Sequence, residues 1–203
     1  MNKTTTKAKR KEFVEALNKH VKNGDTIIIY QDETNFNMYL PRGEGWAPVG
    51  ERATVALPPS QGANRHVQGG VSPEAGIVLM RTHDGSIRKV ENARFVADLF
   101  VAAQGTDEYH ELKSSNMVVV VTDNAPVHSQ VEALVRDMLA ANGIVNGYKL
   151  VLLRLAPYSP MLNPIERRWN VLTTRMKCFV AERKEKLLVR GNTTHLLLTA
   201  WPS

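Results

Sequence analysis

The chain has 203 residues, of which 43% are hydrophobic and 23% charged, as is usual for one soluble domain with a sizeable core. Its formal net charge of +6 favours a polyanionic partner over an acidic protein or a neutral ligand. The single cysteine, Cys178, excludes an intrachain disulfide and suits a reducing compartment inside the cell, and no apolar run has the length of a membrane span.

The first half of the chain predicts a helix followed by an antiparallel meander of strands. After a basic, polar opening, apolar residues recur at helical spacing over 12–22, and Asn23-Gly24 supplies a C-terminal stop. Short apolar runs bounded by turn residues then predict strands. These strands are expected at Thr26–Gln31, on both sides of a turn at 42–45 within 36–57, at 67–71 and 77–82, and, after a hairpin turn at Asp84-Gly85, at 87–90.

The second half of the chain predicts alternating helices and strands. The expected elements are a helix capped by Asn92 and ending near Gly105, a strand at 117–122, a helix with an apolar stripe from Val127 to Leu139, a strand at 150–155 and a helix beginning at Pro164. The two strands are far enough apart in sequence for a crossover that makes them parallel. This order predicts an α/β fold with a mixed five-stranded sheet, an antiparallel meander plus parallel strands, flanked by helices.

Three acidic residues lie where predicted elements end or begin. Asp32 and Asp123 each follow an apolar strand, and Glu166 lies at the start of the final helix. A carboxylate at the exit of a buried strand lies at the sheet edge where open α/β folds bind ligands. Three converging carboxylates would repel one another without a cation between them, and hard oxygen ligands suit Mg²⁺ or Mn²⁺. The pattern therefore predicts metal-dependent cleavage of phosphodiesters.

Each acid also has a structural interpretation. Asp32 and Asp123 suit strand-terminating turns, and Glu33 competes with Asp32 for the site, although strand alternation lets only one of that pair face it. In Asn163-Pro-Ile-Glu166 an N-cap residue, a proline and a glutamate follow in the order of a capping box, in which the glutamate satisfies backbone donors. On the residues alone, both interpretations stay open for Glu166.

The residues around these acids resemble three signature blocks of mariner-like transposases and their bacterial insertion-sequence relatives. Asp-Glu-Thr-Asn-Phe at 32–36, with Arg-Gly-Glu-Gly-Trp-Ala-Pro-Val-Gly at 42–50, resembles the first block. Asp-Asn-Ala-Pro-Val-His at 123–128 resembles the second, and Pro-Tyr-Ser-Pro-Met-Leu-Asn-Pro-Ile-Glu-Arg-Arg-Trp at 157–169 resembles the third. The similarity runs from about Gly24 to about Ala181, and three blocks in the right order are far more specific than one.

The resemblance implies a ribonuclease-H-like fold and a DDE-type endonuclease. It assigns Asp32, Asp123 and Glu166 as the catalytic and metal-binding triad that holds two Mg²⁺ or Mn²⁺ ions. The implied activity is DNA strand cleavage and strand transfer at transposon ends, with double-stranded DNA as partner and a homodimer left open. The expected location is the nucleus in a eukaryote or the cytoplasm in a bacterium.

Further residues are candidates for contact with DNA. Basic side chains surround the apolar stripe of the final helix, which starts at the proposed active site, so they are expected to bind phosphate. A solvated helix face is the structural alternative for these charges. Trp46 is expected to stack on a base, and packing beneath a turn is its structural alternative. The candidates are Trp46, Asn124, His128, Arg167, Arg168, Arg175 and Lys177.

Three segments are expected along the chain: a basic N-terminal segment with a short helix over 1–24, the catalytic domain over 25–186 and an unassigned tail over 187–203. Mariner-like transposases normally carry a helix-turn-helix region ahead of the catalytic domain, and the segment before Thr26 is too short for one. We therefore expect a catalytic domain without its targeting module. The alternative is a catalytically inactive, transposase-derived DNA-binding or interaction protein.

Overall fold

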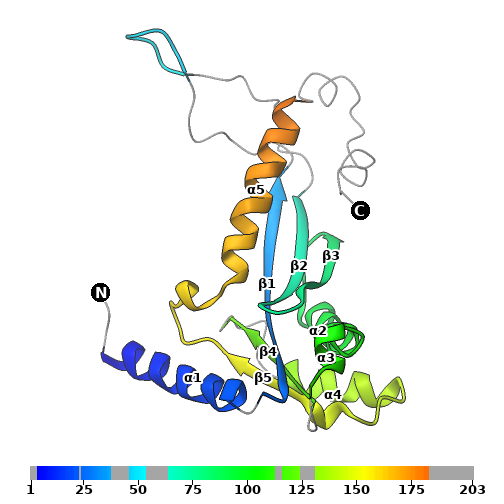
Figure 1. Ribbon diagram of the computed structural model, residues 1–203. Helices are drawn as coiled ribbons and strands as arrows, with labels where there is room; N and C mark the ends of the chain where they lie inside the picture. The colour runs from blue at the N-terminus through cyan, green and yellow to red at the C-terminus, as the bar shows by residue number, and fades with distance from the viewer. Residues whose placement is uncertain are drawn as a thin grey trace. The chain divides into compact units, whose positions relative to one another are not determined.

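The computed structural model describes residues 4–22, 24–37, 46–53, 64–112, 116–123 and 131–182 (Figure 1). The chain divides into two compact units: Met1–Asn35 with Arg65–Glu166, and Phe36–Asn64 with Arg167–Ser203. Within the described ranges no helix combines the length and the apolar character needed to cross a membrane. The sheet and the candidate acids belong to the first unit, and most of the basic final helix belongs to the second.

The sheet has five strands in the order β3-β2-β1-β4-β5. β2 and β3 are antiparallel, whereas β1, β4 and β5 run parallel, which confirms the mixed sheet expected from the sequence. The strands are β1 (Thr26–Asn37), β2 (Asn64–Ser72), β3 (Gly76–Asp84), β4 (Met117–Thr122) and β5 (Leu150–Arg154).

One face of the sheet packs against two helices and forms the main core. Alternate residues of the parallel strands, such as Ile29 and Val120, are fully buried with Phe95 and Leu99 of α2 and Val135 of α4. The helices are α1 (Thr4–Lys22), α2 (Lys89–Gln104), α3 (Asp107–His110), α4 (Val131–Ala141) and α5 (Ile165–Glu182), with short 3-10 turns η2 (Gly147–Lys149) and η3 (Pro160–Leu162).

The opposite face of the sheet is also buried. Ile28 and Tyr30 of β1 and Val119 and Val121 of β4 alternate with the core residues and therefore point to this second face. α1 packs against β5. Burial, with a smaller contribution from the negative charge of Glu74, raises the pKa of the Tyr30 phenol, so this side chain stays neutral. Both faces of the central strands are thus covered, as unbroken apolar runs predict.

Two elements extend furthest beyond the bounds that the sequence predicted. α1 begins at Thr4 instead of residue 12, because the lysine, arginine and alanine residues of the basic opening are strong helix formers. β1 continues beyond Gln31 to Asn37. Its polar end stays in the sheet through β2, where the Gln68 amide donates to the Glu33 carboxylate at 3.2 Å.

Two predictions between the sheet and α2 are wrong. The segment 87–90 is not a strand, because α2 already begins at Lys89, where the Glu91 carboxylate accepts from the Arg88 backbone N–H at 3.2 Å. Asn92 is not the helix cap but a fully buried residue inside α2. The short helix α3 was not predicted either. The strands expected within 36–57 lie largely at 38–45 and 54–57, outside the described residues, and Val127 also lies outside them.

Candidate active site

The parallel pairing of β1 with β4 brings two of the predicted acids together. The register runs from Thr26 opposite Met117 to Tyr30 opposite Val121. Continued for two residues beyond this last pair, the register sets Asp32 of β1 opposite Asp123, which directly follows β4. Residues two apart along a strand share a face, and paired strands lie about 4.8 Å apart, so this continuation assigns both carboxylates to the face of Tyr30 and Val121.

A backbone hydrogen bond joins the last residue of β4 to the residue after β5. The Leu155 backbone N–H donates to the Thr122 carbonyl at 2.9 Å, continuing the pairing of β4 with β5 up to the residue before Asp123. Asp32 lies inside β1, which outlasts β4, and both carboxylates are partly buried. The two acids therefore stand at the carboxyl end of the parallel part of the sheet, although Asp32 does not end its strand.

The third predicted acid, Glu166, lies in the first turn of α5 and is also partly buried. Its backbone N–H donates to the Asn163 carbonyl at 3.2 Å. Among the described residues, no hydrogen bond joins the Glu166 carboxylate to the Asn163 backbone N–H, so the capping-box interpretation of this glutamate has no support.

Asn163 instead directs its side chain toward the first acid. This side chain is only 4% exposed, and its Nδ2 donates to Asp32 Oδ2 at 3.5 Å, the long end of a hydrogen bond. Its Oδ1 is buried and has no hydrogen-bond partner within the described part of the chain. An asparagine at the start of a helix usually caps it with the side-chain oxygen. The Asn163 side chain instead contacts Asp32, a candidate metal ligand.

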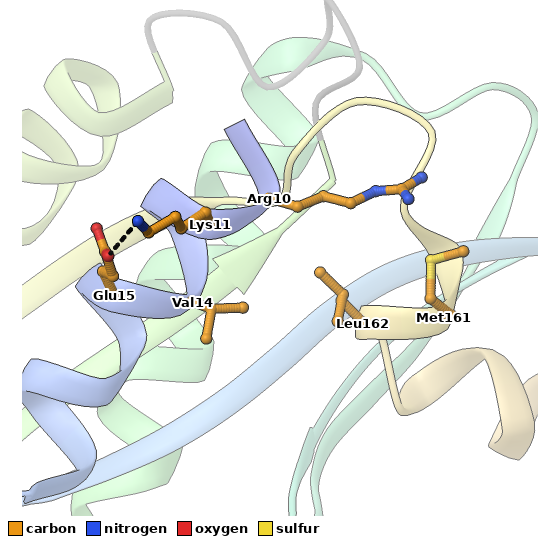
Figure 2. A pocket seen from close by; sticks show the side chains of 6 residues that line it. All are labelled: Arg10, Lys11, Val14, Glu15, Met161 and Leu162. Carbon is orange, nitrogen blue, oxygen red and sulfur yellow. Dashed lines mark ion pairs between the residues drawn. The ribbon is translucent and has the colours of Figure 1, made fainter. Parts of the chain in front are cut away.

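The segment that leads to Asn163 is fastened to α1. Arg10 donates from Nε to Ser159 Oγ at 2.7 Å and from Nη2 to the Tyr158 carbonyl at 2.6 Å. Figure 2 shows Arg10 extending from α1 toward the turn that holds Met161 and Leu162. These residues line an open hollow of about 480 Å³. Tyr158, whose carbonyl accepts one of the Arg10 hydrogen bonds, adopts a φ of 54°, a left-handed conformation that is uncommon outside glycine.

The opposite face of β1 has a different polar group. Gln31 and Gln68 each donate from Nε2 to Asn92 Oδ1, at 3.4 Å and 3.2 Å, and all three side chains are fully buried. Gln68 also donates to Glu33. The Oε1 atoms of both glutamines are buried without a protein partner among the described residues. We call Gln31, Glu33, Gln68 and Asn92 the amide cluster.

The chemistry of the Asp32–Asp123 edge fits a divalent cation. Magnesium is commonly bound by one or two carboxylates, while water and substrate phosphates complete its octahedron. Among the described residues, no three side chains of histidine, cysteine, aspartate or glutamate lie close enough to hold one ion, so Glu166 does not form a single group with the two aspartates. The pair fits an ion, and the complete triad stays a prediction.

The predicted DNA-contacting residues belong to other parts of the chain. Trp46 is fully exposed, Arg167, Arg168 and Arg175 are exposed, and Lys177 is partly buried. These five residues belong to the second unit. Asn124 and His128 lie outside the described residues.

The mixed sheet, with α2 and α4 on its core face and two carboxylates at the edge of its parallel strands, defines a ribonuclease-H-like α/β domain. The chain belongs to the DDE superfamily endonucleases, whose family model matches residues 27–187. No curated protein matches the chain significantly in sequence.

Solved structures of Mos1 mariner transposase share this fold. The chain in the Mos1 paired-end complex with Mn is 20% identical, with a TM-score of 0.61 over 86% of this chain and 50% of that chain. The Mos1 catalytic domain is 17% identical, with a TM-score of 0.54 over 90% of this chain and 74% of that chain. A structure of that domain with raltegravir and Mg is 19% identical, with a TM-score of 0.55 over 89% and 75% of the two chains. The present chain thus matches half the length of the Mos1 chain in the paired-end complex.

Proposed function

We propose that this chain is a DNA transposase catalytic domain that cleaves DNA at the ends of an element and joins the freed strand to target DNA. The observation that supports this most is the parallel register of β1 and β4, which, continued two residues beyond its last pair, sets Asp32 opposite Asp123. The family model of the DDE superfamily endonucleases spans both aspartates and supports this class of reaction.

In this proposal Asp32 and Asp123 hold Mg²⁺ or Mn²⁺, and Glu166 joins them in a triad for two ions. Bound ions would lower the pKa of the attacking water or 3′-hydroxyl and would stabilise the leaving oxygen. The protein contributes fixed positions. β1 and β4 hold the aspartates side by side, and the Asn163 amide steadies Asp32 from a third segment. No covalent bond between enzyme and DNA is required.

We further propose double-stranded DNA as the partner. The exposed Arg167, Arg168 and Arg175 follow Glu166 along α5 and supply positive charge for phosphate contacts, and the net charge of +6 favours such a polyanion. Mos1 transposase is described in a paired-end complex with its left transposon end. By analogy, the present chain would act as a homodimer on two element ends, in the nucleus of a eukaryote or the cytoplasm of a bacterium.

A nicking assay on supercoiled plasmid in Mg²⁺ or Mn²⁺ tests the proposal. Asp123→Asn keeps the size of the side chain but removes one negative charge, so nicking should fall to the metal-free background. Asp137→Asn, the same change on the exposed surface of α4, is the matched control and should nick like the wild type.

The alternative function predicts a different outcome. If the wild-type chain folds and binds DNA but nicks no faster than Asp123→Asn, the protein is an inactive transposase-derived DNA-binding protein. Nicking that is lost equally in Asp123→Asn and Asp137→Asn would point to a general effect of charge and would contradict the assigned site.

A further inference from the structure

Asn163 is distinguished from an ordinary helix-capping asparagine by what its side chain contacts. An N-cap asparagine uses its side-chain oxygen to accept a backbone N–H in the first turn of the helix. Here the first-turn N–H of Glu166 goes to the backbone carbonyl of Asn163, at 3.2 Å. The Asn163 side chain instead donates to Asp32, which lies far away in the sequence.

The side-chain oxygen of Asn163 is the unusual atom. It belongs to a residue that is 96% buried, since only 4% is exposed, and it has no hydrogen-bond partner in the described part of the chain. A buried carbonyl without a partner destabilises the fold, so its retention calls for an explanation. The unpartnered oxygens of Gln31 and Gln68 lie on the other face of β1, whereas that of Asn163 belongs to an amide bonded to Asp32, at the edge that also bears Asp123.

The position of Asn163 is fixed from outside its own helix. Arg10 fastens Tyr158 and Ser159, and the turn η3 follows directly and ends one residue before Asn163. Ser159 is itself buried. A rigid support of this kind is what an oxygen donor needs if it is to meet an ion at a set distance.

We propose that the side-chain carbonyl oxygen of Asn163 is an additional oxygen donor for the divalent ion held by Asp32 and Asp123, directly or through one bound water. The inference rests on the proposed metal site. In it, the two ends of one amide have separate tasks: Nδ2 orients the Asp32 carboxylate, and Oδ1 faces the ion. Amide carbonyls are hard donors of the type that Mg²⁺ and Mn²⁺ accept.

Binding of Mn²⁺ to the DNA-free protein, followed by electron paramagnetic resonance, tests the proposal without reference to activity. Asn163→Leu removes both polar ends at similar volume and should weaken Mn²⁺ binding by about 10- to 100-fold. Its melting temperature in metal-free buffer should equal or exceed that of the wild type, because an unpartnered buried oxygen disappears. Asn170→Leu, the same change at an exposed position of α5, should leave Mn²⁺ affinity unchanged.

A second variant separates the oxygen from the amide nitrogen. Asn163→Asp keeps an oxygen at the site and adds negative charge, so its Mn²⁺ affinity should equal or exceed that of the wild type. This variant decides the matter if Asn163→Leu fails to fold. A tenfold loss of affinity in Asn163→Asp would overturn the proposal.

The outcomes separate this inference from the proposed function. If Asp123→Asn abolishes Mn²⁺ binding while Asn163→Leu binds as the wild type does, the metal site stands and the role of Asn163 is wrong. If the wild type and Asp123→Asn bind Mn²⁺ equally weakly, the metal site itself is wrong and the inference falls with it. A lower melting temperature in metal-free buffer together with unchanged Mn²⁺ affinity in Asn163→Leu would make Asn163 a structural residue only.

Discussion

The two faces of β1 differ in chemistry within three consecutive residues. Gln31 and Glu33 point to the α2 face and join the buried amide cluster, where hydrogen bonds link them to Gln68 and Asn92. Asp32, between them, points to the other face and shares its edge with a second aspartate. Because side chains alternate along the strand, the polar groups that stabilise the fold lie on one face and those available to a ligand lie on the other.

The largest expected effect on stability comes from breaking the amide cluster. Asn92→Ala removes the oxygen that accepts from both Gln31 and Gln68, leaving buried donors without this partner. We expect the free energy of unfolding to fall by about 2–3 kcal/mol, measured by urea denaturation. Mn²⁺ affinity should stay close to that of the wild type when it is measured at urea concentrations low enough for the variant to be fully folded.

Asp123→Asn is the matched contrast on the other face. It keeps the side-chain volume and should change the free energy of unfolding in metal-free buffer by no more than about 0.5–1 kcal/mol, while Mn²⁺ binding is lost. The contrast would break down if Asn92→Ala proved harmless, or if Asp123→Asn destabilised the metal-free protein as much as Asn92→Ala does.

A smaller effect is expected from pH. Burial, followed by the positive charge of Arg81, lowers the pKa of His83 below its usual 6.5; Glu91 acts in the opposite direction and His66 adds to the lowering. The unfolded chain therefore binds a proton at a higher pH than the folded chain. The stability contributed by neutral His83 is complete above about pH 6.5 and is lost as pH falls toward the lower folded pKa.

His83→Gln should consequently flatten the decline of the melting temperature between about pH 7 and about pH 5.5, because the variant has no proton to gain there. His110→Gln, at an exposed position in α3, serves as control and should keep the wild-type slope. An unchanged slope in His83→Gln would show that this histidine titrates alike in the folded and unfolded chains.

Much of the fold could be predicted because the deciding signals are local. Unbroken apolar runs gave β4 and β5 within one residue, and helical periodicity with Gly105 gave the end of α2. Errors arose where long-range pairing overrides local preference. β1 continues through polar residues because β2 pairs with it, and Asn92, a good cap by type, is drawn into the core by two glutamines.

The site could be predicted only in part for the same reason. Asp32 and Asp123 follow apolar strands, so their place at a sheet edge is readable from sequence. Two contacts, Asn163 with Asp32 and Arg10 with Ser159, join segments more than a hundred residues apart. No local sequence pattern predicts such contacts. The one available signal was that an asparagine before proline at a helix start usually caps the helix, and here that signal points to the wrong role.

The central claim is that Asp32 and Asp123 share one divalent ion, and Mn²⁺ anomalous diffraction from crystals of the wild-type protein tests it most directly. We expect an anomalous peak within about 2.3 Å of a carboxylate oxygen of each aspartate, and the loss of this peak in Asp123→Asn. No peak at saturating Mn²⁺, or a peak that lies elsewhere and persists in Asp123→Asn, would contradict the claim.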